Sequence, residues 1–133
     1  MSGFLSDTNI VSELMRPVPD ASVAEWADQQ ETLVISVITL EEILCGLRQK
    51  RLPRKEEWFH KFVSFRCKIL NVDEEIATRS GATRGRFLSA GSPRTQADLL
   101  IAATAWKHRF TLVTRNTKDF DGCQIPVLNP FGG

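Results

Sequence analysis

The sequence predicts an α/β fold in which a central parallel β-sheet of four to five strands is flanked by helices on both faces. Short apolar runs alternate along the chain with longer segments whose apolar residues recur at helical spacing. This strand–helix–strand order implies parallel strands, because each helix carries the chain back to the starting edge of the sheet. With 133 residues, of which 42% are hydrophobic and 25% charged, the chain has the size and composition of one globular domain.

The first half of the chain carries the signals of two strands and four helices. Pro17 ends the first helix because proline lacks an amide hydrogen, and Ser22 with Glu25 matches the capping box that opens the second. The β-branched run 33–37 favours a strand, and Pro53 suits the first turn of the fourth helix. The expected elements are a strand at 4–6, helices at 8–16 and 22–30, a strand at 33–37, a helix from residue 39 and a helix from residue 53.

The second half continues the alternation. Asp73 is expected to cap a long helix, because an aspartate side chain accepts hydrogen bonds from the free amides of a first turn. Glycine and proline at 91–93 indicate a loop before an alanine-rich helix. The expected elements are a strand at 68–72, helices at 73–89 and 95–108, a strand at 111–114 and a short fifth strand at 126–128.

Several classes of protein are excluded by composition. No segment approaches the run of about 18 apolar residues that spans a membrane, and the N-terminal residues lack the basic start of a signal peptide. Three widely spaced cysteines without a C-x-x-C pair and two distant histidines argue against a disulfide framework and a zinc site. We therefore expect a cytoplasmic protein with no membrane contact.

Charge is unevenly distributed, although the formal net charge is only +1. Residues 1–47 contain eight acidic residues and one basic residue, whereas residues 79–118 contain eight basic residues and one acidic residue, Asp98. This asymmetry is typical of a protein that binds a polyanion or a charged partner. Lysines and arginines that merely solvate helix faces would give the same counts, so charge alone leaves both interpretations open.

Four acidic residues are expected at one edge of the sheet. In open parallel sheets, ligands bind beyond the carboxyl ends of the strands, where the strand order reverses. Asp7 directly follows the first strand and Asp119 comes soon after the fourth. Glu42 and Asp98 lie in the first turns of two predicted helices. The topology can therefore bring four distant carboxylates together.

Clustered carboxylates point to a metal ion. Like charges raise one another's pKa, and a divalent cation removes that penalty. Oxygen ligands without nearby histidine or cysteine suit Mg²⁺ or Mn²⁺, whose bound water can attack a phosphodiester. Helix capping is the alternative: Glu42 and Asp98 each follow a threonine at capping-box spacing, and Asp7 and Asp119 could be N-caps. Periodicity does not separate Glu41 from Glu42.

Four blocks of residues surround these acids in a fixed order: Leu5-Ser-Asp7-Thr8-Asn9 through Pro17, Ser36-Val-Ile-Thr39-Leu-Glu-Glu42-Ile-Leu-Cys-Gly46, Ala97-Asp98-Leu-Leu-Ile-Ala-Ala103 and Thr114-Arg-Asn116-Thr-Lys-Asp119-Phe120. Together they resemble a PIN domain, and more closely the VapC/FitB-type toxins of toxin–antitoxin operons. The resemblance covers essentially the whole chain, which is interpreted as a single PIN domain over residues 1–133. The ordered set of blocks is specific, whereas Asp-Thr-Asn alone is not.

The resemblance implies specific site residues. It selects Glu42 over Glu41, because the family places its glutamate before Ile-x-x-Gly, and it leaves Asp121 as the alternative to Asp119. Arg94 and Arg115 flank the expected site and are candidates for a phosphate clamp. The implied metal-binding and catalytic acids are Asp7, Glu42, Asp98 and Asp119, with support from Thr8, Thr114, Asn116, Arg94 and Arg115.

One block departs from the family pattern. The family usually reads Gly-x-Pro-Ile-Gly-x-x-Asp before the third acid, whereas this chain has Arg94 and Thr95 in place of isoleucine and glycine. The acid itself, Asp98, is retained. The departure leaves substrate preference and loop shape open at this point.

The function implied by the resemblance is that of a Mg²⁺-dependent endoribonuclease, the toxin of a type II toxin–antitoxin system, acting on tRNA or rRNA. The choice of RNA over DNA comes from the resemblance alone. It also implies a homodimer, inhibition by a cognate antitoxin, and operator DNA contacted only through that antitoxin. The alternative is a FitB-like binding module that acts within an antitoxin–operator complex and has little nuclease activity.

Overall fold

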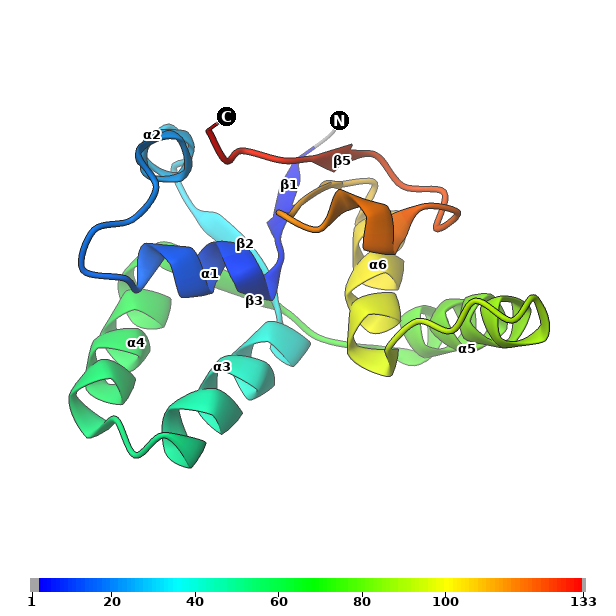
Figure 1. Cartoon of the computed structure of the whole chain (residues 1–133), viewed down its shortest axis with the longest axis horizontal. Helices are drawn as coiled ribbons and strands as arrows, with labels where there is room; N and C mark the ends of the chain where they lie inside the picture. The colour runs from blue at the N-terminus through cyan, green and yellow to red at the C-terminus, as the bar shows by residue number, and fades with distance from the viewer. Residues whose placement is uncertain (1–2, 133) are drawn as a thin grey trace.

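The computed structural model describes residues 3–132 and contains a five-stranded parallel sheet with helices on both faces (Figure 1). The strands are β1 (Phe4–Ser6), β2 (Leu33–Ser36), β3 (Cys67–Leu70), β4 (Thr111–Val113) and β5 (Val127–Leu128). The helices are α1 (Thr8–Leu14), α2 (Ala21–Asp28), α3 (Val37–Gln49), α4 (Pro53–Arg66), α5 (Glu74–Ser89), α6 (Gln96–His108) and the 3₁₀ helix η1 (Thr117–Phe120). The predicted fold class is therefore confirmed.

The strand order is β3-β2-β1-β4-β5, and every neighbouring pair is parallel. From β1 the chain builds outward through β2 to β3, and it then returns to place β4 on the other side of β1. The order thus reverses between β1 and β4, which is where an open α/β sheet provides a ligand crevice.

The two faces of the sheet bury different helices, because successive side chains of a strand point to opposite sides. Leu5 and Leu112 pack in one cluster with buried residues of α5 and α6. On the other face, Ile35 packs with residues of α1, α3 and α4, and Val113 packs with residues of α1 and α2. This sandwich fixes the carboxyl ends of β1 and β4 between two helical layers.

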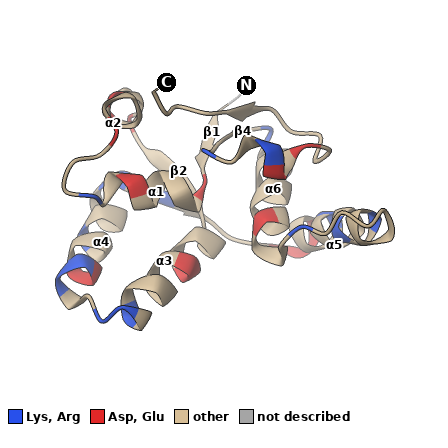
Figure 2. Cartoon of the chain, viewed as in Figure 1, with Lys and Arg blue, Asp and Glu red and all other residues tan. Residues whose placement is uncertain are grey.

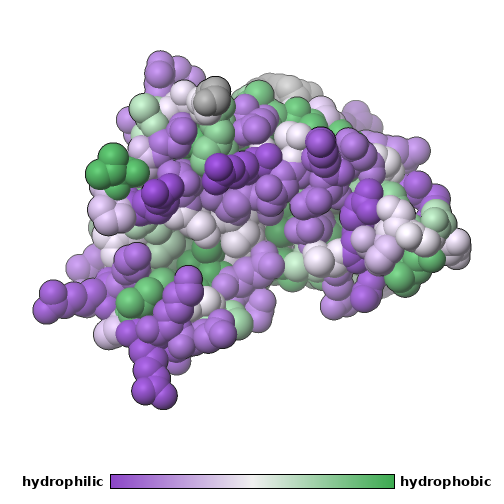
Figure 3. Space-filling model, viewed as in Figure 1, coloured by the Kyte–Doolittle hydropathy of each residue, from purple (hydrophilic) through white to green (hydrophobic). Residues whose placement is uncertain are grey.

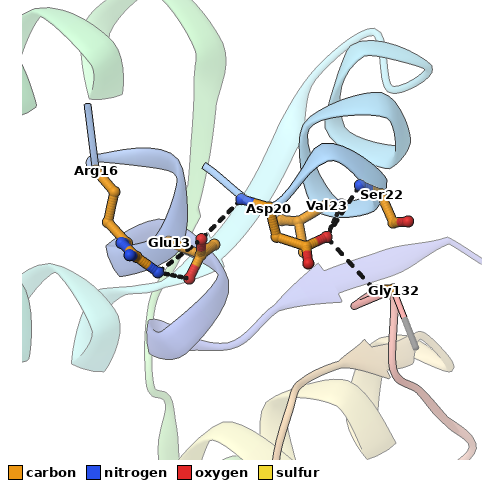
Figure 4. Close-up of polar contacts among 6 residues, drawn as sticks. All are labelled: Glu13, Arg16, Asp20, Ser22, Val23 and Gly132. Atoms are coloured by element: carbon orange, nitrogen blue, oxygen red, sulfur yellow. Dashed lines mark hydrogen bonds and ion pairs between the residues drawn. The ribbon is translucent and has the colours of Figure 1, made fainter. Parts of the chain in front are cut away.

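Two helices begin at residues other than those predicted. α2 is capped by Asp20, whose Oδ1 accepts hydrogen bonds from the amides of Ser22 and Val23, so the predicted capping box at Ser22 is wrong. Figure 4 shows this cap beside Glu13, a buried carboxylate at the end of α1 that accepts from the Asp20 amide at 2.8 Å.

α3 begins directly where β2 ends. The Ser36 hydroxyl accepts from the Ile38 amide and caps the helix, so the predicted start at Thr39 is wrong. The predicted caps at Asp73 and Thr95 are confirmed. Strand β3 ends at Leu70 rather than at residue 72, and η1 was not predicted. No helix within residues 3–132 is long and apolar enough to cross a membrane.

Candidate functional site

A cleft of about 300 Å³ opens at the carboxyl edge of the sheet, beside the β1/β4 reversal. On the face shown in Figure 3, the surface is indented between the lobe of α3 and α4 and the lobe of α5 and α6. The cleft brings together all four acidic residues singled out in the sequence. Its lining residues are Asp7, Thr8, Asn9, Ser12, Glu42, Asp98, Asn116, Asp119 and Phe120.

Asp7 is the innermost of the four acids. It directly follows β1, is only 4% exposed, and caps α1 through a 2.8 Å hydrogen bond from the Thr8 amide to Oδ1. Its other oxygen accepts hydrogen bonds from Thr114 Oγ1 at 2.9 Å and from Asn9 Nδ2 at 3.2 Å. Asp7 therefore both caps α1 and lines the cleft.

Burial dominates the electrostatics of Asp7 and raises the pKa of its carboxyl to about 6. The hydrogen bonds from Thr114 and Thr8 lower the pKa, while the charges of Asp98 and Glu42 raise it further. An ionised carboxylate at this position is therefore poorly compensated by its surroundings.

A polar network behind Asp7 joins the ends of β1 and β4. Asn9 Nδ2 donates to Thr114 Oγ1 at 3.1 Å, and Asn9 Oδ1 accepts from the Arg115 amide at 3.0 Å. Thr114 Oγ1 also accepts from the Asn116 amide at 3.1 Å. Thr114 is fully buried, so these bonds fix its hydroxyl in the direction that donates to Asp7.

Glu42 reaches the cleft from the second turn of α3. Its Oε1 accepts a 2.6 Å hydrogen bond from Thr8 Oγ1, and the Thr8 hydroxyl lies 3.0 Å from that of Thr39. Because Thr39 lies inside the helix and Ser36 caps it, the capping-box interpretation of Glu42 is wrong. The neighbouring Glu41 is exposed and does not line the cleft.

Asp98 and Asp119 form the opposite wall. Asp98 is half-buried in the first turn of α6, where its amide donates to Thr95 Oγ1, so one half of the predicted capping box is present. Burial raises the pKa of Asp98, and the charges of Asp119 and Glu42 add to that rise. Asp119 lies within η1, whose N-cap residue is Asn116, so Asp119 is not an N-cap. Asp121 follows η1, is exposed and does not line the cleft.

The four acids share the cleft but do not form a closed cage. Among residues 3–132, no group of three or more His, Cys, Asp or Glu side chains converges closely enough to hold a metal ion alone. Figure 2 shows acidic positions on α3 and α6 and at the end of β1 towards the middle of the view, with basic positions at the outer ends of α3 and α4 and along α5.

The two flanking arginines differ in their surroundings. Arg94 Nε donates to the Asp119 carbonyl at 3.1 Å, and its Nη1 donates to Ser92. Arg115 is exposed, and its guanidinium lies 4.7 Å from the centre of the Phe131 ring.

Three lining residues were not selected from the sequence: Asn9, Ser12 and Phe120. Asn9 belongs to the Asp-Thr-Asn block, and its position two residues after Asp7 was the available signal. Ser12 lies one helical turn after Thr8, so the helix period alone places both on one face of α1.

Comparisons with known proteins agree with this architecture. The family model "PIN domain" matches residues 4–122. The toxin FitB of Neisseria gonorrhoeae is 33% identical, over 96% of this chain and 97% of its own. The tRNA(fMet)-specific endonuclease VapC of Shigella flexneri is 32% identical, over 91% and 92%. The crystal structure of DNA-bound VapBC from Salmonella typhimurium contains a chain that superposes with a TM-score of 0.85 at 26% identity, over 96% of this chain and 98% of that one. The chain therefore belongs to the PIN-domain family, as a relative of the VapC/FitB-type toxins.

Proposed function

We propose that the chain acts as one PIN domain over residues 1–133, as the toxin of a type II toxin–antitoxin system and as a Mg²⁺-dependent endoribonuclease. One observation carries the proposal: acids from four separate segments, Asp7, Glu42, Asp98 and Asp119, line one cleft where the strand order reverses. The names of the relatives, a toxin and a tRNA endonuclease, support the same activity.

The donor set fits a hard, hydrated cation. The charged groups that line the cleft are carboxylates, and carboxylate oxygens with several retained waters are the ligands that Mg²⁺ prefers. Burial is the main cause of the raised pKa values of Asp7 and Asp98, and neighbouring carboxylates raise them further; a cation between these acids would offset both costs.

A bound Mg²⁺ would supply an activated water and neutralise charge that develops on the phosphate. Asp7, Glu42, Asp98 and Asp119 would hold it. Thr114 orients Asp7 by donating to Oδ2, and Thr8 orients Glu42 by donating to Oε1. Asn116, at the rim, and Arg115, exposed beside it, would contact the phosphate backbone of the substrate.

The partners follow from the same assignment. We propose tRNA or rRNA as the substrate, a cognate antitoxin as the inhibitor, a homodimer as the assembly, and operator DNA reached only through the antitoxin. The related Salmonella structure is a VapBC complex bound to DNA, which supports a second protein and a DNA contact in the assembly. We propose a cytoplasmic location for all of these interactions.

The test is cleavage of tRNA and rRNA by the purified chain with Mg²⁺, Mn²⁺ or EDTA. Asp98→Asn should lower the cleavage rate by at least about a hundredfold, because it removes a charge that holds the cation. Glu57→Gln is the matched control, since Glu57 is an exposed acid on α4 outside the cleft. The cleavage rates of Asp119→Asn and Asp121→Asn should differ, and the slower variant identifies the fourth acid of the site.

Two results would overturn the assignment. Undiminished cleavage by Asp98→Asn would show that the activity does not come from this cleft. No metal-dependent cleavage by the parent, with antitoxin binding retained by Asp98→Asn, would support the FitB-like binding module instead.

A further inference from the structure

The loop that departs from the family pattern is tied to the helix that carries Asp119. Arg94 is partly buried, and its Nε donates a 3.1 Å hydrogen bond to the carbonyl oxygen of Asp119. Its Nη1 donates to the carbonyl oxygen of Ser92 at 3.0 Å and to the Ser92 hydroxyl at 2.7 Å. The guanidinium also lies 4.6 Å from the centre of the Phe87 ring on α5. One side chain therefore joins α5, the 91–95 loop and η1.

Two further arginines continue this arrangement. Arg86 Nη2 donates to the Gly122 carbonyl at 2.9 Å, and Arg79 Nη2 donates to Gln124 Oε1 at 2.9 Å. The Phe87 ring contacts both Arg86 and Arg94 and packs against Gly122. Segment 119–124 is thus held along its length by arginines of α5 and of the loop that follows it.

Phe120 and Cys123 anchor segment 119–124 in the core, but the segment's own backbone does little to fix the Asp119 carboxylate. η1 is a four-residue 3₁₀ helix without a side-chain cap, and such short helices have weak internal hydrogen bonding. Asp119 itself is exposed, so its position depends on what holds its backbone. Two hydrogen bonds hold the backbone of Asp119 itself: its amide donates to the Asn116 carbonyl at 3.1 Å, and its carbonyl accepts from Arg94 Nε at 3.1 Å.

We infer that Arg94 is a positioning residue that holds Asp119 at the wall of the cleft and is not a phosphate clamp. The inference rests on the proposed nuclease function, in which Asp119 helps to hold the cation. The isoleucine usual at this position has no donor for the Asp119 carbonyl, so this chain holds η1 by a contact that the usual pattern lacks.

The first measurement is hydrogen–deuterium exchange of the η1 amides, which requires no activity. Arg94→Ala should speed exchange at Asp119 and Asp121 about tenfold, the effect expected for loss of a charge-assisted hydrogen bond. Arg94→Lys should recover part of the protection. Arg84→Ala is the matched control, since Arg84 is an exposed arginine on α5 that lines no part of the cleft. Equal exchange in Arg94→Ala and Arg84→Ala would overturn the inference.

The second measurement separates positioning from phosphate binding. Arg94→Ala should lower kcat about tenfold with KM changed less than about twofold, because the substitution displaces the Asp119 carboxylate without removing a group that binds the substrate. In an Asp119→Asn background, Arg94→Ala should have little further effect, since both changes act through one carboxylate. A raised KM that persists in the Asp119→Asn background would identify a phosphate clamp and overturn the inference. Faster exchange in a chain whose parent cuts no RNA would refute the nuclease proposal while supporting the placement of Asp119.

Discussion

Replacing Asp7 by asparagine should make the metal-free protein more stable above pH 6 and abolish its activity. Asp7 is 4% exposed and has a pKa of about 6, raised chiefly by burial. At neutral pH the folded protein must therefore keep a poorly solvated charge ionised. Asparagine has the same shape and no charge, so the substitution removes this cost and the proposed metal ligand together.

The magnitude follows from the pKa shift. A rise from 3.8 to about 6 corresponds to about 3 kcal/mol between the two protonation states. Because the folded-state pKa is raised, the stability that Asp7 contributes is fully present below about pH 4 and is lost as the pH rises through 6. An asparagine amide that faces Asn9 Nδ2 would add a constant penalty of about 1–2 kcal/mol at every pH. The pH-dependent part is therefore the informative quantity.

The assay is urea unfolding of the parent and Asp7→Asn in EDTA between pH 4 and pH 7.5. The difference in unfolding free energy should move by about 3 kcal/mol in favour of Asp7→Asn across this range, roughly 10 °C in Tm for a chain of this size. Added Mg²⁺ should then stabilise the parent more than the variant, because the cation binds the ionised carboxylate. A difference that stays constant from pH 4 to pH 7.5 would refute the reasoning.

Three further substitutions probe the surroundings of the cleft and the packing of two glycines. Thr114→Val removes the hydroxyl that donates to Asp7 Oδ2 and that lowers the pKa of Asp7. The acidic side of the pH profile of cleavage should therefore shift to higher pH, and the cleavage rate should fall about tenfold. An acidic side that does not move would contradict the role of this hydrogen bond. Gly122→Ala should lower the unfolding free energy by about 1–3 kcal/mol in urea titrations, because Gly122 has φ +83° and an added Cβ would lie 3.2 Å from Phe87. Gly46→Ala should raise the unfolding free energy by about 0.5–1 kcal/mol in the same titrations, since an added Cβ at Gly46 meets nothing within 4 Å and alanine favours the interior of α3. Equal changes in unfolding free energy at the two glycines would show that local geometry does not govern these effects.

The fold was predictable because its signals are local. Alternation of short apolar runs with helix-period segments located all five strands and the six α-helices to within a few residues. The starts of two helices were not predictable in this way. Asp20 and Ser22 are both good capping residues, and Asp20 is also approached by the Gly132 amide from the far end of the chain, a contact that no local rule contains.

The location of the acids was predictable from topology, because the carboxyl ends of parallel strands meet at one edge. Their supporting side chains were harder to find. Ser12 is a polar residue on a short helix and looks like an ordinary solvated position in sequence. Asn9 acts by bridging Asp7 to Thr114 and the Arg115 amide, and these partners come together only when β4 lies beside β1. Arg94 falls in the one block where the resemblance fails, so the family pattern gave no guide to its contacts.

The bond between Asp7 and Thr114 joins residues 107 positions apart, and it bears on how the chain is synthesised. Translation delivers Asp7 before its supporting hydroxyl on Thr114, which emerges only after the segments that carry Glu42 and Asp98. A ribosome-bound or truncated polypeptide that stops before β4 thus lacks the strand that fixes Asp7 and the segment that carries Asp119. For a chain that we propose to be toxic to its own translation machinery, the order of synthesis therefore delays activity until β4 and η1 have been made.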